Sequence, residues 1–223
     1  GRGEFKAQLD YSFNRVTADA ANITTYFLND GNRVVTENRN GVDRSHSLSG
    51  KFIYELNQKT AFINNTLKTN IDWDDVRLGV TGSLPNDQTA SLPDYYVGND
   101  FKIIKRFNGS SRNALGSAKN HLVTFISKNE WESLPQTLSV SINDGVLRQQ
   151  VKDHAFYTNE SAAYAFSVKG ITISLEGGVK GYFRTLNTEL PDMPEEIPGE
   201  TTNVLNTNYF TVYATPKFEY WAK

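Results

Sequence analysis

The N-terminal part of the chain alternates strictly between apolar and polar side chains. Phe5, Ala7, Leu9, Tyr11 and Phe13 are apolar, and every residue between them is polar. A period of two predicts a β-strand with one apolar side, because successive side chains of a strand point to opposite faces. Residues 5–13 therefore predict a strand roughly 30 Å long. Strands of globular domains average about 5–6 residues, whereas a strand that crosses a membrane needs about 9–11.

The alternation recurs along the whole chain. It returns over residues 48–56, 61–73, 76–84, 97–107, 134–142, 164–168, 171–183 and 209–220. Asp74-Asp75 separates two of these segments, and we interpret it as a turn. The pattern predicts an all-β fold: an antiparallel up-and-down meander of about 9–12 long strands in a single domain, residues 1–223. Such a meander forms a β-barrel or an incomplete segment of a barrel.

The connections are expected to differ in length at the two ends of the sheet. Residues 57–59, 108–111 and 169–170 predict short turns, while residues 84–95 and 191–207 predict long loops. Short turns at one end and long loops at the other are typical of outer-membrane barrels. A soluble β-sandwich remains the alternative, and strand length favours the barrel.

Composition excludes several classes of protein. Net charge is −2 and no basic run exceeds Lys105-Arg106, so nucleic acid is not an expected partner. No stretch is long and apolar enough for a transmembrane helix, and the absence of cysteine excludes disulfides and thiolate chemistry. The 38% hydrophobic content is compatible with a barrel, in which only alternate residues face lipid. Both ends of the chain lie close to strand patterns, so we expect it to be part of a longer protein.

Three segments resemble the barrel region of TonB-dependent outer-membrane receptors of the Bacteroidetes type. They are Asn-Asp-Phe-Lys-Ile-Ile-Lys-Arg at 99–106, Leu-Pro-Gln-Thr-Leu-Ser-Val at 134–140 and Thr-Pro-Lys-Phe-Glu-Tyr at 215–220. The resemblance implies a barrel of about 22 strands around a plug, located in the bacterial outer membrane. It further implies uptake of an unidentified nutrient, with the lipid bilayer and TonB as partners. TonB would act through a plug domain that this sequence does not contain.

Aromatic residues are the first group of candidate functional residues. Trp73, Trp131, Trp221 and Tyr54 are expected near strand ends, where amphipathic rings form girdles at the two borders of a membrane. In a soluble module the same rings would serve as platforms for sugar stacking.

Acidic residues around a proline-rich loop are the second group. Asp192, Glu195, Glu196 and Glu200 lie in or just after residues 191–198, and a loop at the barrel mouth could steer a cationic or metal-chelate ligand. A solvated loop without a ligand explains the same composition.

No catalytic or metal-binding motif occurs. His46, His121 and His154 are far apart and lack the spacing of metal ligands. We therefore expect no enzymatic activity, no cofactor and no metal. The leading hypothesis is the wall and outer loops of a nutrient-uptake receptor; the alternative is a soluble β-sandwich that binds glycan or protein.

Overall fold

The structure consists of β-strands throughout its described part. The computed structural model describes residues 2–28, 31–82, 85–107, 111–113, 116–142, 145–192 and 200–220. These residues contain strands and short connections, and none of them belongs to a helix that could cross a membrane. The predicted all-β class is confirmed.

Nine strands occur in the described residues, and eight of them are long. They are β1 (Arg2–Leu28), β2 (Gly31–Asn57), β3 (Ala61–Gly82), β4 (Asn86–Phe107), β5 (Ser111–Asn113), β6 (Gly116–Ile142), β7 (Gly145–Val168), β8 (Ile171–Glu189) and β9 (Thr202–Tyr220). The long strands have 19 to 27 residues. That is about twice the length needed to cross a membrane.

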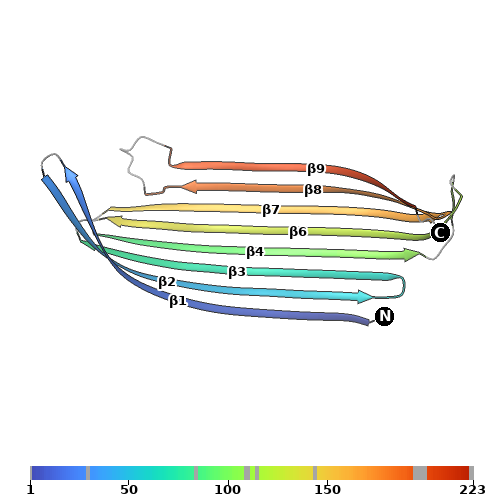
Figure 1. Ribbon diagram of the computed structural model, residues 1–223, viewed down its shortest axis with the longest axis horizontal. Coiled ribbons are helices and arrows are strands. Elements are labelled where there is room, and N and C mark those ends of the chain that lie inside the picture. Colours follow the sequence, from blue (N-terminus) through green and yellow to red (C-terminus); the bar gives the residue numbers. More distant parts are fainter. Residues whose placement is uncertain are drawn as a thin grey trace.

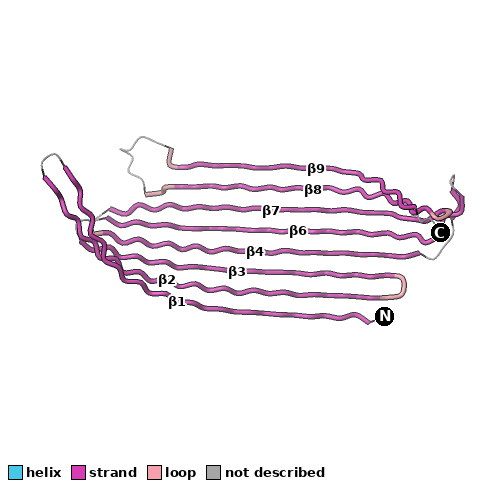
Figure 2. The backbone as a smooth tube through the Cα atoms, viewed as in Figure 1, coloured by secondary structure: helices cyan, strands magenta, loops and turns pink. Residues whose placement is uncertain are grey.

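The long strands form one open, curved antiparallel sheet (Figure 1). Their order is β1-β2-β3-β4-β6-β7-β8-β9, and β5 pairs with β6 only. Each long strand thus neighbours the long strand before it in sequence, which is the predicted meander. β1 and β9 are the two edges, and the sheet does not close. Figure 2 shows that both chain ends lie at the same end of the strands, which we call the terminal end of the sheet.

The predicted turn at Asp74-Asp75 is wrong, because β3 runs through it without interruption. Asp74 pairs with Ser45 on β2 and with Leu92 on β4, in unbroken register. The apolar residues are odd-numbered as far as Trp73 and even-numbered from Val76 onward. Such a change predicts two strands, but β3 is one strand whose apolar side moves to the other face of the sheet.

The predicted long loop at residues 84–95 is also wrong, because β4 begins at Asn86. Proline disfavours strand interiors, since it has no N–H for the ladder. Here Pro93 pairs with Trp73 on the β3 side, while the ladder to β6 is interrupted between Ser91 and Tyr95. The strand therefore tolerates the missing donor.

The other predicted connections are partly confirmed. The loop at residues 191–207 is shorter than expected, since β9 already starts at Thr202. The tight turn at Lys169-Gly170 is confirmed: both residues have positive φ, 49° and 82°, which a two-residue hairpin connection of this kind requires. The turn predicted at residues 108–111 falls mostly outside the described residues.

Gly178 on β8 lies between Ser161 on β7 and Tyr213 on β9, and its replacement by alanine is expected to destabilise the sheet. A Cβ atom there would lie 2.6 Å from the backbone oxygen of Glu160 and 2.7 Å from the ring of Tyr213. Because backbone cannot move aside cheaply, we expect Gly178→Ala to lower the free energy of unfolding by about 1–3 kcal/mol, measured by urea titration followed by circular dichroism.

Gly177 supplies the matched control for that prediction. Its Cβ would meet only the Tyr213 backbone oxygen at 3.7 Å, an ordinary contact. Gly177→Ala should therefore change stability by less than about 0.5 kcal/mol. Equal losses for the two variants would contradict the close approach at Gly178.

Candidate functional site: an apolar belt and a charged face

The register places every strand side chain on one of two faces. Residues directly opposite each other in antiparallel strands project to the same side of a sheet. The face that carries Phe5 on β1 also carries Tyr54 on β2, Asn65 on β3 and Phe101 on β4. We call this the belt face, and the opposite face, which carries Lys6, the charged face.

Apolar side chains cover the belt face over the terminal end of the sheet. Many are open to the surroundings: Leu9 is 67% exposed, Leu175 57% and Phe218 69%. This apolar belt comprises Phe5, Ala7, Leu9, Tyr11 and Phe13 on β1; Leu48, Phe52, Tyr54 and Leu56 on β2; Ile63, Leu67, Ile71 and Trp73 on β3; Tyr95, Val97, Phe101, Ile103 and Phe107 on β4; Val123, Phe125 and Trp131 on β6; Phe156, Tyr164, Phe166 and Val168 on β7; Ile171, Ile173, Leu175, Val179 and Phe183 on β8; and Phe210, Val212, Phe218 and Tyr220 on β9. Measured along a strand it is roughly 30–40 Å tall.

The border of the belt farther from the chain ends crosses the strands obliquely. On β1 this border is Phe13. On β9 it is Phe210, whose row of partners leads back across the sheet to Ala7 on β1, a shift of six residues over seven steps between strands. The rise is about 3.3 Å per residue and the spacing between strands is about 4.8 Å. The border would therefore lie parallel to a membrane plane if the strands tilted by roughly 30° from the membrane normal. Barrel strands in membranes tilt by about 35–45°.

Two predicted girdle residues lie on this border. The Trp73 indole stacks on the His46 imidazole with ring centroids 4.8 Å apart and an angle of 8° between the planes. Trp131 is 41% exposed and lies opposite Phe156 on the same border. Tyr54 lies toward the other border of the belt, and Trp221 is outside the described residues.

The expectation that these rings lie near strand ends is wrong for Trp73 and Trp131. Both sit in the interior of their strands, because β3 and β6 continue well past the belt. The rings mark the border of the belt and not the end of the strand.

A small polar island interrupts the belt over β3 to β7. The Glu160 carboxylate accepts hydrogen bonds from Ser127 Oγ at 2.6 Å and from Asn129 Nδ2 at 2.9 Å. Asn99 Nδ2 donates to Asn65 Oδ1 at 2.9 Å. The side chains of the island satisfy one another, which lowers the cost of placing them among apolar neighbours.

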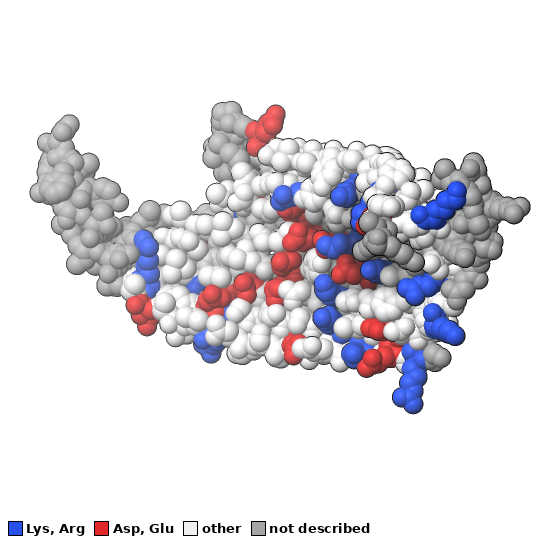
Figure 3. Space-filling model, turned by 45° about the vertical axis from the view of Figure 1, so that its right-hand side comes forward, with Lys and Arg blue, Asp and Glu red and all other residues white. Residues whose placement is uncertain are grey.

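The charged face is polar at the height of the belt, and its charges lie in two bands. The lysine band is nearer the chain ends and contains Lys6, Lys51, Lys68, Lys102, Lys128 and Lys180. The acidic band lies beyond it and contains Asp72, Asp74, Asp94, Glu132 and Asp153. Figure 3 shows the red side chains as a diagonal band, with most of the blue ones to one side of it.

Ion pairs occur on this face both between neighbouring strands and within one strand, β6. Lys68 Nζ lies 3.4 Å from Asp100, and Lys128 Nζ lies 2.7 Å from Glu130. Arg184 on β8 donates hydrogen bonds to both carboxylate oxygens of Asp153 on β7. The Asp153 side chain is only 8% exposed. The face is thus charged where the opposite face is apolar.

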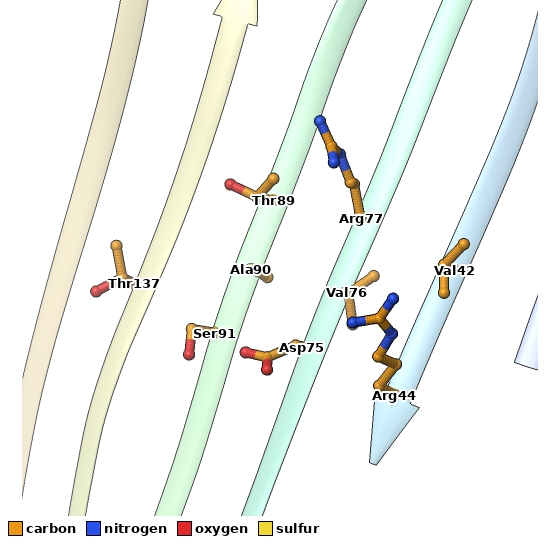
Figure 4. A pocket seen from close by; sticks show the side chains of 9 residues that line it. All are labelled: Val42, Arg44, Asp75, Val76, Arg77, Thr89, Ala90, Ser91 and Thr137. Atoms are coloured by element: carbon orange, nitrogen blue, oxygen red, sulfur yellow. The ribbon is translucent and has the colours of Figure 1, made fainter. Parts of the chain in front are cut away.

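Beyond the belt the polarity of the two faces is reversed. The charged face becomes apolar there, with Val76, Leu78 and Val80 on β3 and Leu138 and Val140 on β6. Val80 is only 5% exposed. The belt face becomes polar and contains a groove of about 380 Å³ on β2, β3, β4 and β6 (Figure 4).

The groove lies directly past the Trp73–His46 stack. Its lining is Val42, Arg44, Asp75, Val76, Arg77, Thr89, Ala90, Ser91 and Thr137. Sequence reasoning missed this site, because its residues come from four strands and become neighbours only through the register. The change of parity after Trp73 was the one available signal.

The predicted acidic loop is only partly described. Asp192 and Glu200 are exposed, and Glu195 and Glu196 lie outside the described residues. The Asp192 carboxylate lies 3.6 Å from Arg148 Nε of β7, so this acid already has a cationic neighbour. The role of the loop in steering a ligand stays a prediction.

The three histidines lie apart on the sheet, each beside a hydroxyl group. Tyr11 Oη lies 2.9 Å from His46 Nδ1, Tyr164 Oη 2.6 Å from His121 Nδ1, and Ser133 Oγ 2.9 Å from His154 Nδ1. Among the residues that the structure describes, no group of three or more acidic or histidine side chains could hold a metal ion.

Comparisons with models of protein families, with curated proteins and with solved structures found no match to this chain.

Proposed function

We propose that the chain forms part of the wall of an outer-membrane β-barrel, with the belt face toward lipid and the charged face toward an aqueous interior. One observation carries the proposal: along the same stretch of the same strands, one face is apolar and exposed while the other is lined with charges. A soluble sheet would bury its apolar face under a second layer, and the described residues form one sheet. In a bilayer, lipid covers that face instead.

The open edges fit a role as one sector of a larger barrel. β1 and β9 leave a row of backbone N–H and C=O groups unpaired along their outer sides. In lipid every such group must be satisfied within the protein, so a spanning sheet has to close. Further strands that pair with β1 and β9 would complete the barrel.

A TonB-dependent nutrient receptor is the specific form of this proposal. The segments that resemble such receptors lie in β4, β6 and β9, all within the proposed wall. Lysine and acidic bands on the inward face would line the path of a polar nutrient. In this account the wall binds or guides solute and carries out no chemistry, so absence of enzymatic activity stays a prediction.

Folding of the full chain with and without an amphiphile tests the proposal. The chain, diluted from urea, should gain its strand signal in detergent micelles or lipid vesicles. It should then migrate differently on a gel before and after boiling. In buffer alone it should aggregate, because the belt has no cover. A compact, soluble monomer in buffer without amphiphile would overturn the assignment.

A further inference from the structure

The groove on the belt face is positively charged and lies where lipid headgroups would be. It opens one row past His46 and Trp73, the border of the belt on β2 and β3. In the proposed orientation, acyl chains lie against the belt and headgroups lie at this border. A headgroup site at this position therefore rests on the proposed function.

Three arginines occupy neighbouring positions on β1, β2 and β3, in or beside the groove, and none of them has a partner among the described residues. Arg15 on β1 lies directly opposite Arg44 on β2, and Arg77 is the diagonal neighbour of Arg44 on β3. In the described part of the chain none of the three makes a hydrogen bond or an ion pair. Like charges directly opposite each other destabilise a sheet, and an anion bound between them would remove the repulsion.

Hydroxyl groups add further donors. Figure 4 shows the Arg44 and Arg77 guanidinium groups extending over the sheet, with Thr89 and Ser91 on β4 and Thr137 on β6 lining the same groove. Guanidinium groups bind phosphate in a fork of two parallel hydrogen bonds, and hydroxyls donate to the remaining oxygens.

Asp75 is the one acid in the groove. It lies opposite Arg44 in the register but makes no ion pair with it. The lining holds Arg44 and Arg77 against this one aspartate, a formal charge of about +1, so the site still attracts an anion. Arg15 lies beside the groove on β1, while Asp19 and Asp87 line the adjoining hollow together with Arg77. Asp75 repels a bound anion, so its replacement by a neutral residue should raise the affinity for the anion, whereas replacement of an arginine should lower it.

We propose that this groove binds the phosphate of a membrane lipid headgroup. The belt next to it supplies the second half of the recognition, because the acyl chains of the same lipid lie on Leu48, Ile71 and Tyr95 in the row beside the aromatic stack. A free phosphate ion would gain the arginine contacts but not the apolar ones, so the lipid should bind far more tightly.

Fluorescence of Trp73 provides the test. In a full-length variant with Trp131→Phe and Trp221→Phe, Trp73 is the remaining tryptophan. This variant is folded in dodecyl maltoside micelles and titrated with phosphatidylglycerol or with inorganic phosphate. We expect the lipid to change Trp73 emission at a concentration at least about a hundredfold below that of inorganic phosphate. R44Q combined with R77Q should weaken lipid binding about tenfold or more, and Asp75→Asn should strengthen it.

The matched control removes two charges from neighbouring strands on the opposite face. K51Q combined with K102Q lies on β2 and β4 of the charged face and should leave lipid binding within about twofold. Equal weakening by both double variants, or equal affinity for lipid and inorganic phosphate, would overturn the headgroup site. Failure of the unsubstituted chain to fold in micelles would instead refute the proposed function, and this inference with it.

Discussion

Replacing Ile103 by arginine is expected to destabilise the membrane-folded chain by about 2–4 kcal/mol, the cost of a lipid-facing arginine near the bilayer midplane. Ile103 lies inside the belt on β4, between Ile63 on β3 and Phe125 on β6. Its neighbours across the strands are apolar, so the new guanidinium would have no partner at that depth. The free energy of unfolding in lipid vesicles, from urea titration followed by tryptophan fluorescence, measures the loss.

The adjacent residue gives a control with the same substitution. Ile104 points to the charged face, where it lies between Phe62 and Thr124 and on the same strand face as Lys102. An arginine there would reach the proposed aqueous interior, so Ile104→Arg should cost less than about 1 kcal/mol, mainly through lost packing. Similar losses for the two variants would show that the belt face does not face lipid.

The strands of the terminal end of the sheet were predictable because their signal is local. A strand with one face in an apolar environment alternates with period two whatever its neighbours are. Residues 5–13 show this pattern without a break and lie within β1. The antiparallel meander followed from short turn signals such as Lys169-Gly170, which a hairpin needs for its positive φ angles.

The full length of the strands was not predictable from the same pattern. Each long strand passes through two environments, and its apolar side changes face between them, as at Trp73 and Val76 on β3. A prediction from the period-two pattern assumes that each face of a strand has one environment along its whole length. The change of the apolar side from one face to the other therefore resembles a turn between two strands. Asp74-Asp75 reinforced that interpretation, since acids are common in turns.

The arginine groove required information that no single segment contains. Arg44, Arg77, Ser91 and Thr137 are separated by up to 93 positions in the sequence, and four strands must pair in one register to bring them together. A slip of one residue in any strand would send its member of the groove to the opposite face. The belt is less sensitive, because many residues share in it.

Substitution of Arg184 by alanine is the second change with a large expected effect. Asp153 has a side chain only 8% exposed, and Arg184 is its ion-pair partner. The loss of Arg184 would leave that carboxylate unpaired within the acidic band. Because the Arg184 side chain itself is 45% exposed, we expect a loss near the lower end for broken buried pairs, about 2–3 kcal/mol.

A double-mutant cycle separates the charge from the packing. In an Asp153→Asn background the neighbouring amide carries no charge, so Arg184→Ala should then cost less than about 1 kcal/mol. Unfolding in urea, compared across the four proteins of the cycle, gives the coupling between the two side chains. An equal loss in both backgrounds would mean that Arg184 acts through its aliphatic stem on neighbouring side chains. A large coupling would instead show that the Asp153–Arg184 ion pair stabilises the pairing of β7 with β8 within the acidic band of the charged face.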